Sequence, residues 1–139
     1  MTLGTRLAIG AGLLCSTVPL LAHHSFAAEY DSTKTVSIKG VVQKVAWVNP
    51  HAYVWVDVKD DSGKVTTYAF ESLSPNALAR SGWTRNSLKP GDEVTVDGYL
   101  AKDGKPLADG SIHANSKLIT LSDGRKVFAG SSADNAAYK

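Results

Sequence analysis

From Thr35 onwards the chain alternates apolar and polar residues with the two-residue period of β-strands. Val and Ile recur through 35–48, where Gly40 predicts a bulge or sharp bend, and Asn49-Pro50 ends this stretch. Apolar residues at 52, 54, 56 and 58 alternate with aromatic and polar ones, and after a turn at 60–63 a returning strand follows at 64–70. Further strands are expected from Val94 and over 112–121, with a short tail strand after Gly124.

One segment between the third and fourth strands has the pattern of a helix. Ser74 suits the N-cap, Pro75 suits the first helical position, and Gly82 ends a helix that runs through Ser81. Three strands, a short helix and two strands are the order of an OB-fold, a small five-stranded, partly open barrel. We therefore predict an all-β domain with one short helix over residues 35–130. An antiparallel sandwich is the alternative, but it leaves the helix unexplained.

The first 22 residues have the pattern of a secretory signal peptide. Arg6 precedes an uncharged apolar stretch over 7–21, and Ala22 ends the cleavage signal. The apolar stretch is short for a membrane span, although an uncleaved anchor is the alternative reading. We expect a periplasmic or secreted protein without a membrane segment after cleavage, with an N-terminal arm at 23–34 and a flexible tail at 131–139.

Composition narrows the functions open to such a domain. The chain has 15 Lys and Arg against 13 Asp and Glu, and cleavage after Ala22 removes only Arg6 from this balance, so the mature net charge is near zero. This balance excludes the basic field that nucleic-acid binding needs. The single cysteine, Cys15, lies in the signal peptide. The mature domain therefore has no disulfide, and any metal must be held by nitrogen and oxygen ligands.

Several short motifs resemble those of a known family. They are AHHSFAAEYD at 22–31, NPH at 49–51, SPN at 74–76, GW at 82–83 and LKPGDEVTVDGY at 88–99. Together they resemble a family of secreted bacterial proteins known only as a domain of unknown function. The resemblance implies secretion and a single small β-domain, and it implies no activity.

Motifs of common enzymes are absent from the sequence. It contains no P-loop, GxGxxG, HExxH or GxSxG, and no spacing fixes a pair of carboxylates for acid–base work. Asp57, Asp60 and Asp61 are interpreted as turn and solubility residues, because the remaining ligands of a calcium loop are missing. We therefore expect a binding protein and not an enzyme, with a hydrolase built from unrecognised carboxylates as a third class.

The histidines favour a copper site. Cleavage after Ala22 makes His23 the first residue, and its α-amino group and imidazole together form a compact chelate. Cu(II) binds such nitrogen ligands most strongly among the divalent first-row metals. The other candidate ligands are His24, His51 and His113. Two alternatives stay open. Cleavage after Ala27 would discard both N-terminal histidines. Independently of cleavage, the second reading is that His51 only caps a turn and His113 lies on a solvent face.

An aromatic face is the second candidate site. Trp47, Tyr53 and Trp55 are expected on the non-aliphatic face of the first two strands, a region where OB-folds bind oligonucleotides and oligosaccharides. With a near-neutral charge, such a face favours a small ligand, a glycan or a periplasmic protein. The alternative is that one or more of these rings covers the barrel. Trp83 is predicted to be core, and ion pairs around the helix are expected from Glu71, Arg80 and Arg85.

Overall fold

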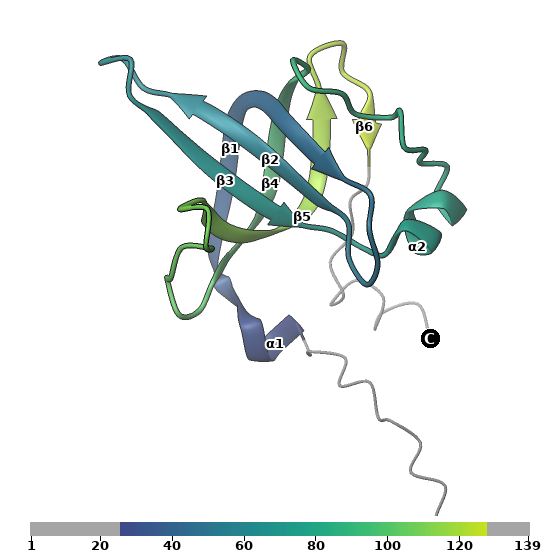
Figure 1. Cartoon of the computed structure of the whole chain (residues 1–139), viewed down its shortest axis with the longest axis horizontal. Helices are drawn as coiled ribbons and strands as arrows, with labels where there is room; N and C mark the ends of the chain where they lie inside the picture. The colour runs from purple at the N-terminus through teal and green to yellow at the C-terminus, as the bar shows by residue number, and fades with distance from the viewer. Residues whose placement is uncertain (1–25, 128–139) are drawn as a thin grey trace, which may run out of the picture.

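The computed structural model describes residues 26–127, which form a barrel with two short helices (Figure 1). The predicted signal peptide and the tail at 131–139 lie outside these residues. The elements are α1 (Phe26–Glu29), β1 (Tyr30–Ala46), β2 (Tyr53–Lys59), β3 (Val65–Glu71), α2 (Pro75–Arg80), β4 (Glu93–Ala101), β5 (Ile112–Leu121) and β6 (Lys126–Val127). Within the described part of the chain, no helix is both long and apolar enough to cross a membrane.

The strands close into the predicted five-stranded barrel. They follow the order β3-β2-β1-β4-β5-β6, and an additional pairing of β3 with β5 closes the ring. This closing pair is parallel, whereas the other neighbours are antiparallel. With α2 between β3 and β4, the arrangement confirms the OB-like class expected from the order of elements.

The long strand β1 pairs with two neighbouring strands and bends across the barrel. Its first part pairs with β4 and its last part with β2. The register irregularity in its pairing with β2 falls between Val42 and Lys44, slightly beyond the predicted position at Gly40. Gly40 instead marks a close approach, because a Cβ there would lie 2.3 Å from the carbonyl oxygen of Asp57.

β1 also begins five residues earlier than the sequence pattern predicts. Its first residue, Tyr30, pairs with Ala101 of β4 and is 2% exposed. The polar run that follows hides this start, because residues 32–35 are exposed and show no apolar alternation. The expected arm at 23–34 therefore contains α1 and the beginning of β1.

The core occupies the interior of the barrel and its end beneath α2. Alternate residues of the strands, such as Val54, Val56 and Ile119, point inwards and are 2% exposed or less. Leu78 of α2 closes the barrel end at 1% exposure, and Trp83 joins the same cluster as predicted. Ser74 caps α2 by accepting a hydrogen bond from the Ala77 amide, which also agrees with the prediction.

Candidate functional site

A buried carboxylate, Glu71, lies at the end of β3 on the outer surface of the barrel wall. The residue is 8% exposed. Two phenols donate to the same carboxylate oxygen, Oε2: Tyr30 Oη at 2.8 Å and Tyr53 Oη at 2.7 Å. The second oxygen, Oε1, faces His51, whose Nδ1 is 3.5 Å away. The two oxygens of one carboxylate therefore have different surroundings.

The two histidines that the structure describes both lie against Glu71. His113 Nε2 is 3.8 Å from Oε2 and 2.8 Å from the oxygen of Tyr30. Because the Tyr30 hydroxyl gives its single hydrogen to Glu71, the Nε2–H of His113 must donate to Tyr30. The Nδ1 of a neutral His113 ring then holds the lone pair.

The same nitrogen of His51 that faces Glu71 also contacts the backbone. Its Nδ1 lies 3.1 Å from the carbonyl oxygen of Ser72, so this nitrogen donates its hydrogen there. In the neutral ring, Nε2 is then the acceptor. The side chain of His51 remains one-third exposed.

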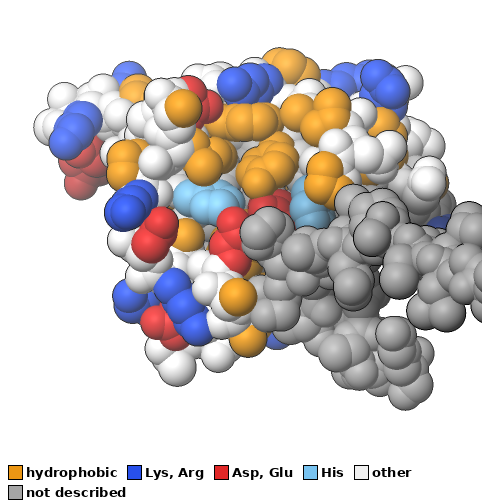
Figure 2. All heavy atoms as spheres, turned by 60° about the horizontal axis from the view of Figure 1, so that its bottom comes forward, with side chains coloured by type: hydrophobic (Ala, Val, Ile, Leu, Met, Phe, Trp, Pro, Cys, Tyr) orange, Lys and Arg blue, Asp and Glu red, His pale blue; other side chains and the backbone are white. Residues whose placement is uncertain are grey.

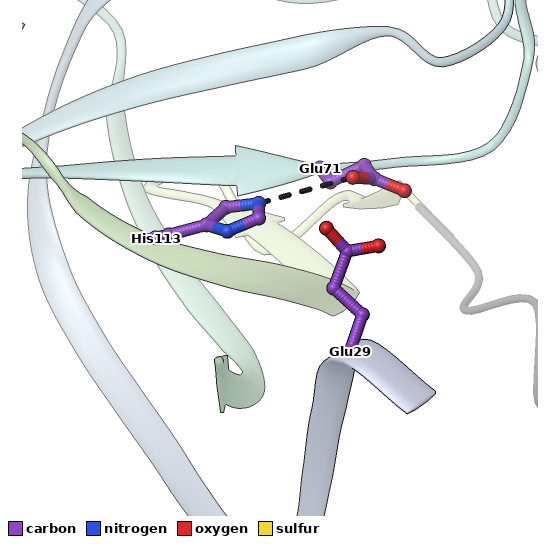
Figure 3. Close-up of side chains that lie close together, drawn as sticks. All are labelled: Glu29, Glu71 and His113. Atoms are coloured by element: carbon purple, nitrogen blue, oxygen red, sulfur yellow. Dashed lines mark ion pairs between the residues drawn. The ribbon is translucent and has the colours of Figure 1, made fainter. Parts of the chain in front are cut away.

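Glu29 completes the group from α1. One donor atom each of Glu29, Glu71 and His113 lie within 4.8 Å of one another, and Figure 3 shows both carboxylates turned towards the imidazole. A cavity of about 250 Å³ opens beside Glu29 and His113, and Lys102 and Asp103 also line it. We refer to the following residues as the Glu71 cluster: Glu29, Tyr30, His51, Tyr53, Glu71 and His113.

Charge and hydrogen bonding keep the Glu71 carboxyl ionised. Burial alone would raise its pKa, but the interactions with His113, Tyr53 and Tyr30 lower the pKa to about 2, with a further contribution from the charge of His51. The same contacts act in the opposite direction on the phenols. Burial first, and then the neighbouring Glu71 charge, raise the pKa of Tyr30 well above its usual range. For Tyr53, burial and the hydrogen bond to Glu71 also raise the pKa.

The barrel topology explains why these residues meet. Antiparallel pairing puts Tyr53 of β2 directly opposite Glu71 of β3. Parallel pairing then puts His113 of β5 opposite Ala69, two residues before Glu71 and therefore on the same face. The rings also pack, since Tyr53 stacks on His113 with centroids 6.3 Å apart. In Figure 2, the two described histidines lie on either side of acidic side chains, next to a group of hydrophobic ones.

Some of the predicted ligands come together here and others do not. His51 and His113 meet at one carboxylate, whereas His23 and His24 lie outside the described residues. The sequence analysis missed the central role of Glu71, which was expected in ion pairs with Arg80 and Arg85. Within residues 26–127 its ion pairs are instead with the two histidines. The parallel β3–β5 pairing of an OB-fold was the available signal for this contact.

The predicted aromatic face divides into two parts. Tyr53 and Trp55 are neighbours on the outer side of β2, with ring centroids 5.6 Å apart. Trp47 does not join them, because it is half-buried against the core cluster. Tyr53 thus connects the predicted aromatic face with the Glu71 cluster, since its ring adjoins Trp55 and its hydroxyl donates to Glu71.

Of the acidic residues predicted at turns, Asp60 behaves as predicted, whereas Asp57 lies within β2 and is half-buried. Asp60 accepts hydrogen bonds from the Ser62 amide and hydroxyl and from the Lys64 amide, which orders the β2–β3 turn. Asp57 accepts from the Thr67 hydroxyl at 2.6 Å, across the same pair of strands. Neither carboxylate contributes to the Glu71 cluster.

Comparison with protein families identifies the class to which this domain belongs. Residues 10–110 match a family described as a family of unknown function (DUF6152), so the chain belongs to that family. Comparison with curated proteins and with solved structures gave no match. Function must therefore be argued from the site itself.

Proposed function

We propose that this protein is an exported, periplasmic or secreted, metal-binding domain that holds a divalent transition metal, with Cu(II) as the preferred ion, at the Glu71 cluster. The observation that supports this proposal is the convergence of donor atoms from Glu29, Glu71 and His113 within 4.8 Å. Metal binding through Nε2 of His113 requires the ring hydrogen to lie on Nδ1 instead, so the hydrogen bond from Nε2 to Tyr30 is given up when the metal binds. Imidazole nitrogen and carboxylate oxygen are suitable ligands for Cu(II). The absence of cysteine from the predicted mature chain makes a thiolate site impossible.

The contacts around the donor atoms favour binding over mere packing. Metal-binding histidines usually donate their other ring N–H to a carbonyl or carboxylate, and His51 Nδ1 does so towards Ser72. The two phenols occupy Oε2 of Glu71, which leaves Oε1 on the side of His51. Within the described residues, no hydrogen bond or ion pair engages the Glu29 carboxylate, so it is free to turn towards a cation.

The predicted mature N-terminus supplies further nitrogen ligands. Glu29 lies in α1, which begins at Phe26, and His23 and His24 precede Phe26 by three and two residues. Three extended residues span at most about 10 Å, so the sequence keeps both imidazoles within reach of α1. Copper selectivity over Zn(II) is expected from the added amine and imidazole nitrogens, because Cu(II) leads the affinity order for such ligands.

The test is Cu(II) retention by protein exported with its own signal sequence. Native mass spectrometry of the metal-free chain gives its first residue, and one added equivalent of Cu(II), challenged with a competing chelator, gives stoichiometry and affinity. We expect one retained Cu(II) in a chain that begins at His23. Glu71→Gln and His113→Gln should each weaken retention at least tenfold, whereas the exposed control Glu93→Gln should leave it unchanged.

Two results would separate the parts of this proposal. Loss of copper when a methionine precedes His23, with no effect of Glu71→Gln, would put the metal on the N-terminus alone and refute the cluster. A chain that begins at Ala28 would refute the contribution of His23 and His24, and a chain that retains no copper would refute the copper assignment altogether. Circular dichroism of each variant shows whether a loss reflects unfolding, and only folded variants are compared.

A further inference from the structure

We propose that a groove beside Trp55 is a second binding site, which takes a neutral saccharide independently of the metal. The groove has a volume of about 550 Å³, within the range of small-ligand sites. The groove lies between strands β1, β2 and β3 and the loop that joins β4 to β5. Its principal lining residues are Gln43, Lys44, Trp55, Thr66, Asp109 and Ser111.

The indole of Trp55 is held in place before any ligand arrives. Its Nε1–H donates to Asp109 Oδ2 at 2.9 Å, and Asp109 in turn accepts from the Ser111 amide at 3.0 Å. Lys44 Nζ lies 4.0 Å from the centre of the ring and 3.8 Å from Asp109. A ring fixed in this way loses little conformational entropy when a ligand stacks on it.

The chemistry of the lining fits a sugar better than other ligands. A sugar ring has an apolar C–H surface, which an indole can cover, and hydroxyl groups that both donate and accept hydrogen bonds. The groove offers the amide of Gln43 and the hydroxyl of Thr66 for these groups. The carboxylate of Asp109 can also accept hydrogen bonds from the rim of the ligand.

Charge in the groove selects against ionic ligands. Lys44 and Lys64 line it together with Asp109, and Asp57 lies behind the lining residue Thr67. Two cations face two anions, so the groove has no net field to attract a phosphate backbone. Its position on β2 and β3, beside the β4–β5 loop, is one where OB-folds bind oligosaccharides.

Lys44 lies over the ring that a sugar would stack on. Its ammonium group covers one face of Trp55, but the side chain is 52% exposed and long, so it can move to the rim. A stacked sugar would take its place over the indole. Removal of this lysine should therefore leave saccharide affinity unchanged or increase it.

The experiment measures binding of maltotetraose, cellotetraose and chitotetraose by calorimetry and tryptophan fluorescence, with the whole exported chain in metal-free form. We expect at least one of them to bind, with a tenfold or greater loss in Trp55→Ala and a smaller loss in Trp55→Phe. Asp109→Asn should weaken binding, and Lys44→Ala should not. Asp123→Asn, an exposed carboxylate on the β5–β6 turn, is the matched control.

Each outcome decides the proposal. Failure of all three sugars to bind at millimolar concentration, or equal binding by folded Trp55→Ala and the unchanged chain, would overturn it. Binding of an oligonucleotide in preference to the sugars would also overturn it. Retention of sugar binding in Glu71→Gln would separate this site from the metal cluster, and loss in that folded variant would refute their independence.

Discussion

The replacement of Glu71 by glutamine should remove a defined part of the pH dependence of folding. In the folded protein the pKa of this carboxyl is about 2, against an ordinary value of 4.5. The ionised carboxylate therefore stabilises the fold fully above pH 4.5, and this contribution is lost as the pH falls towards 2. At about 1.4 kcal/mol per pH unit, the contribution is roughly 3 kcal/mol at neutral pH.

Glu71→Gln cannot ionise, so it should lack this contribution. We expect the variant to be less stable than the unchanged protein by about 3 kcal/mol at pH 7, with the difference shrinking towards zero near pH 2. Urea unfolding followed by tryptophan fluorescence at a series of pH values measures it. Glu93→Gln, which changes an exposed carboxylate, is the control.

Parallel stability curves for Glu71→Gln and the unchanged protein between pH 4.5 and 2 would refute this reasoning. Such a result would mean that the contacts from Tyr30, Tyr53 and His113 do not favour the ionised carboxyl. A variant that is more stable at neutral pH would refute it as well, because the cost of burying the charge would then exceed the gain from its partners.

Two further substitutions test the fold. Gly40→Ala should destabilise the barrel by about 3 kcal/mol, because the added Cβ would lie 2.3 Å from the Asp57 carbonyl oxygen. Thermal unfolding measures this loss, with the exposed substitution Ser37→Ala as the control. Equal melting temperatures for the two variants would contradict the prediction. Ser74→Ala should lower the free energy of unfolding by about 1 kcal/mol, because the Ala77 amide loses its hydrogen-bond acceptor. Urea unfolding at neutral pH measures this difference, and an unchanged free energy of unfolding would contradict the prediction.

The fold was accessible from the sequence because its signals are local. Alternation in β2 and β5, the Ser74-Pro75 helix start and the turn at Asp60 each lie within one short window. The order of these elements then implied the barrel. The early start of β1 escaped because the residues after Tyr30 are exposed and polar, so nothing in their pattern distinguishes a strand from an arm.

The candidate site was harder to predict because its residues are distant in sequence. Tyr30 and Glu71 are 41 residues apart, and Tyr30 and His113 are 83 apart. The histidines were identified by their chemistry, but their common partner depends on the β3–β5 register, which no single segment encodes. Trp47 was predicted on the aromatic face but packs against the core. Residue type alone does not distinguish an aromatic ring on the core from one on a binding face.

The loop between β4 and β5 touches both proposed sites. At its beginning, the Lys102 amide donates to the Glu29 carbonyl and the Lys102 ammonium group donates to the Ala27 carbonyl, while near its end Asp109 holds the indole of Trp55. Independent binding therefore requires that neither ligand shifts this loop, because a shift at one end would change the free energy of binding at the other. Thermodynamic linkage would make any such change reciprocal, so a metal that altered the sugar affinity by some factor would have its own affinity altered by the same factor.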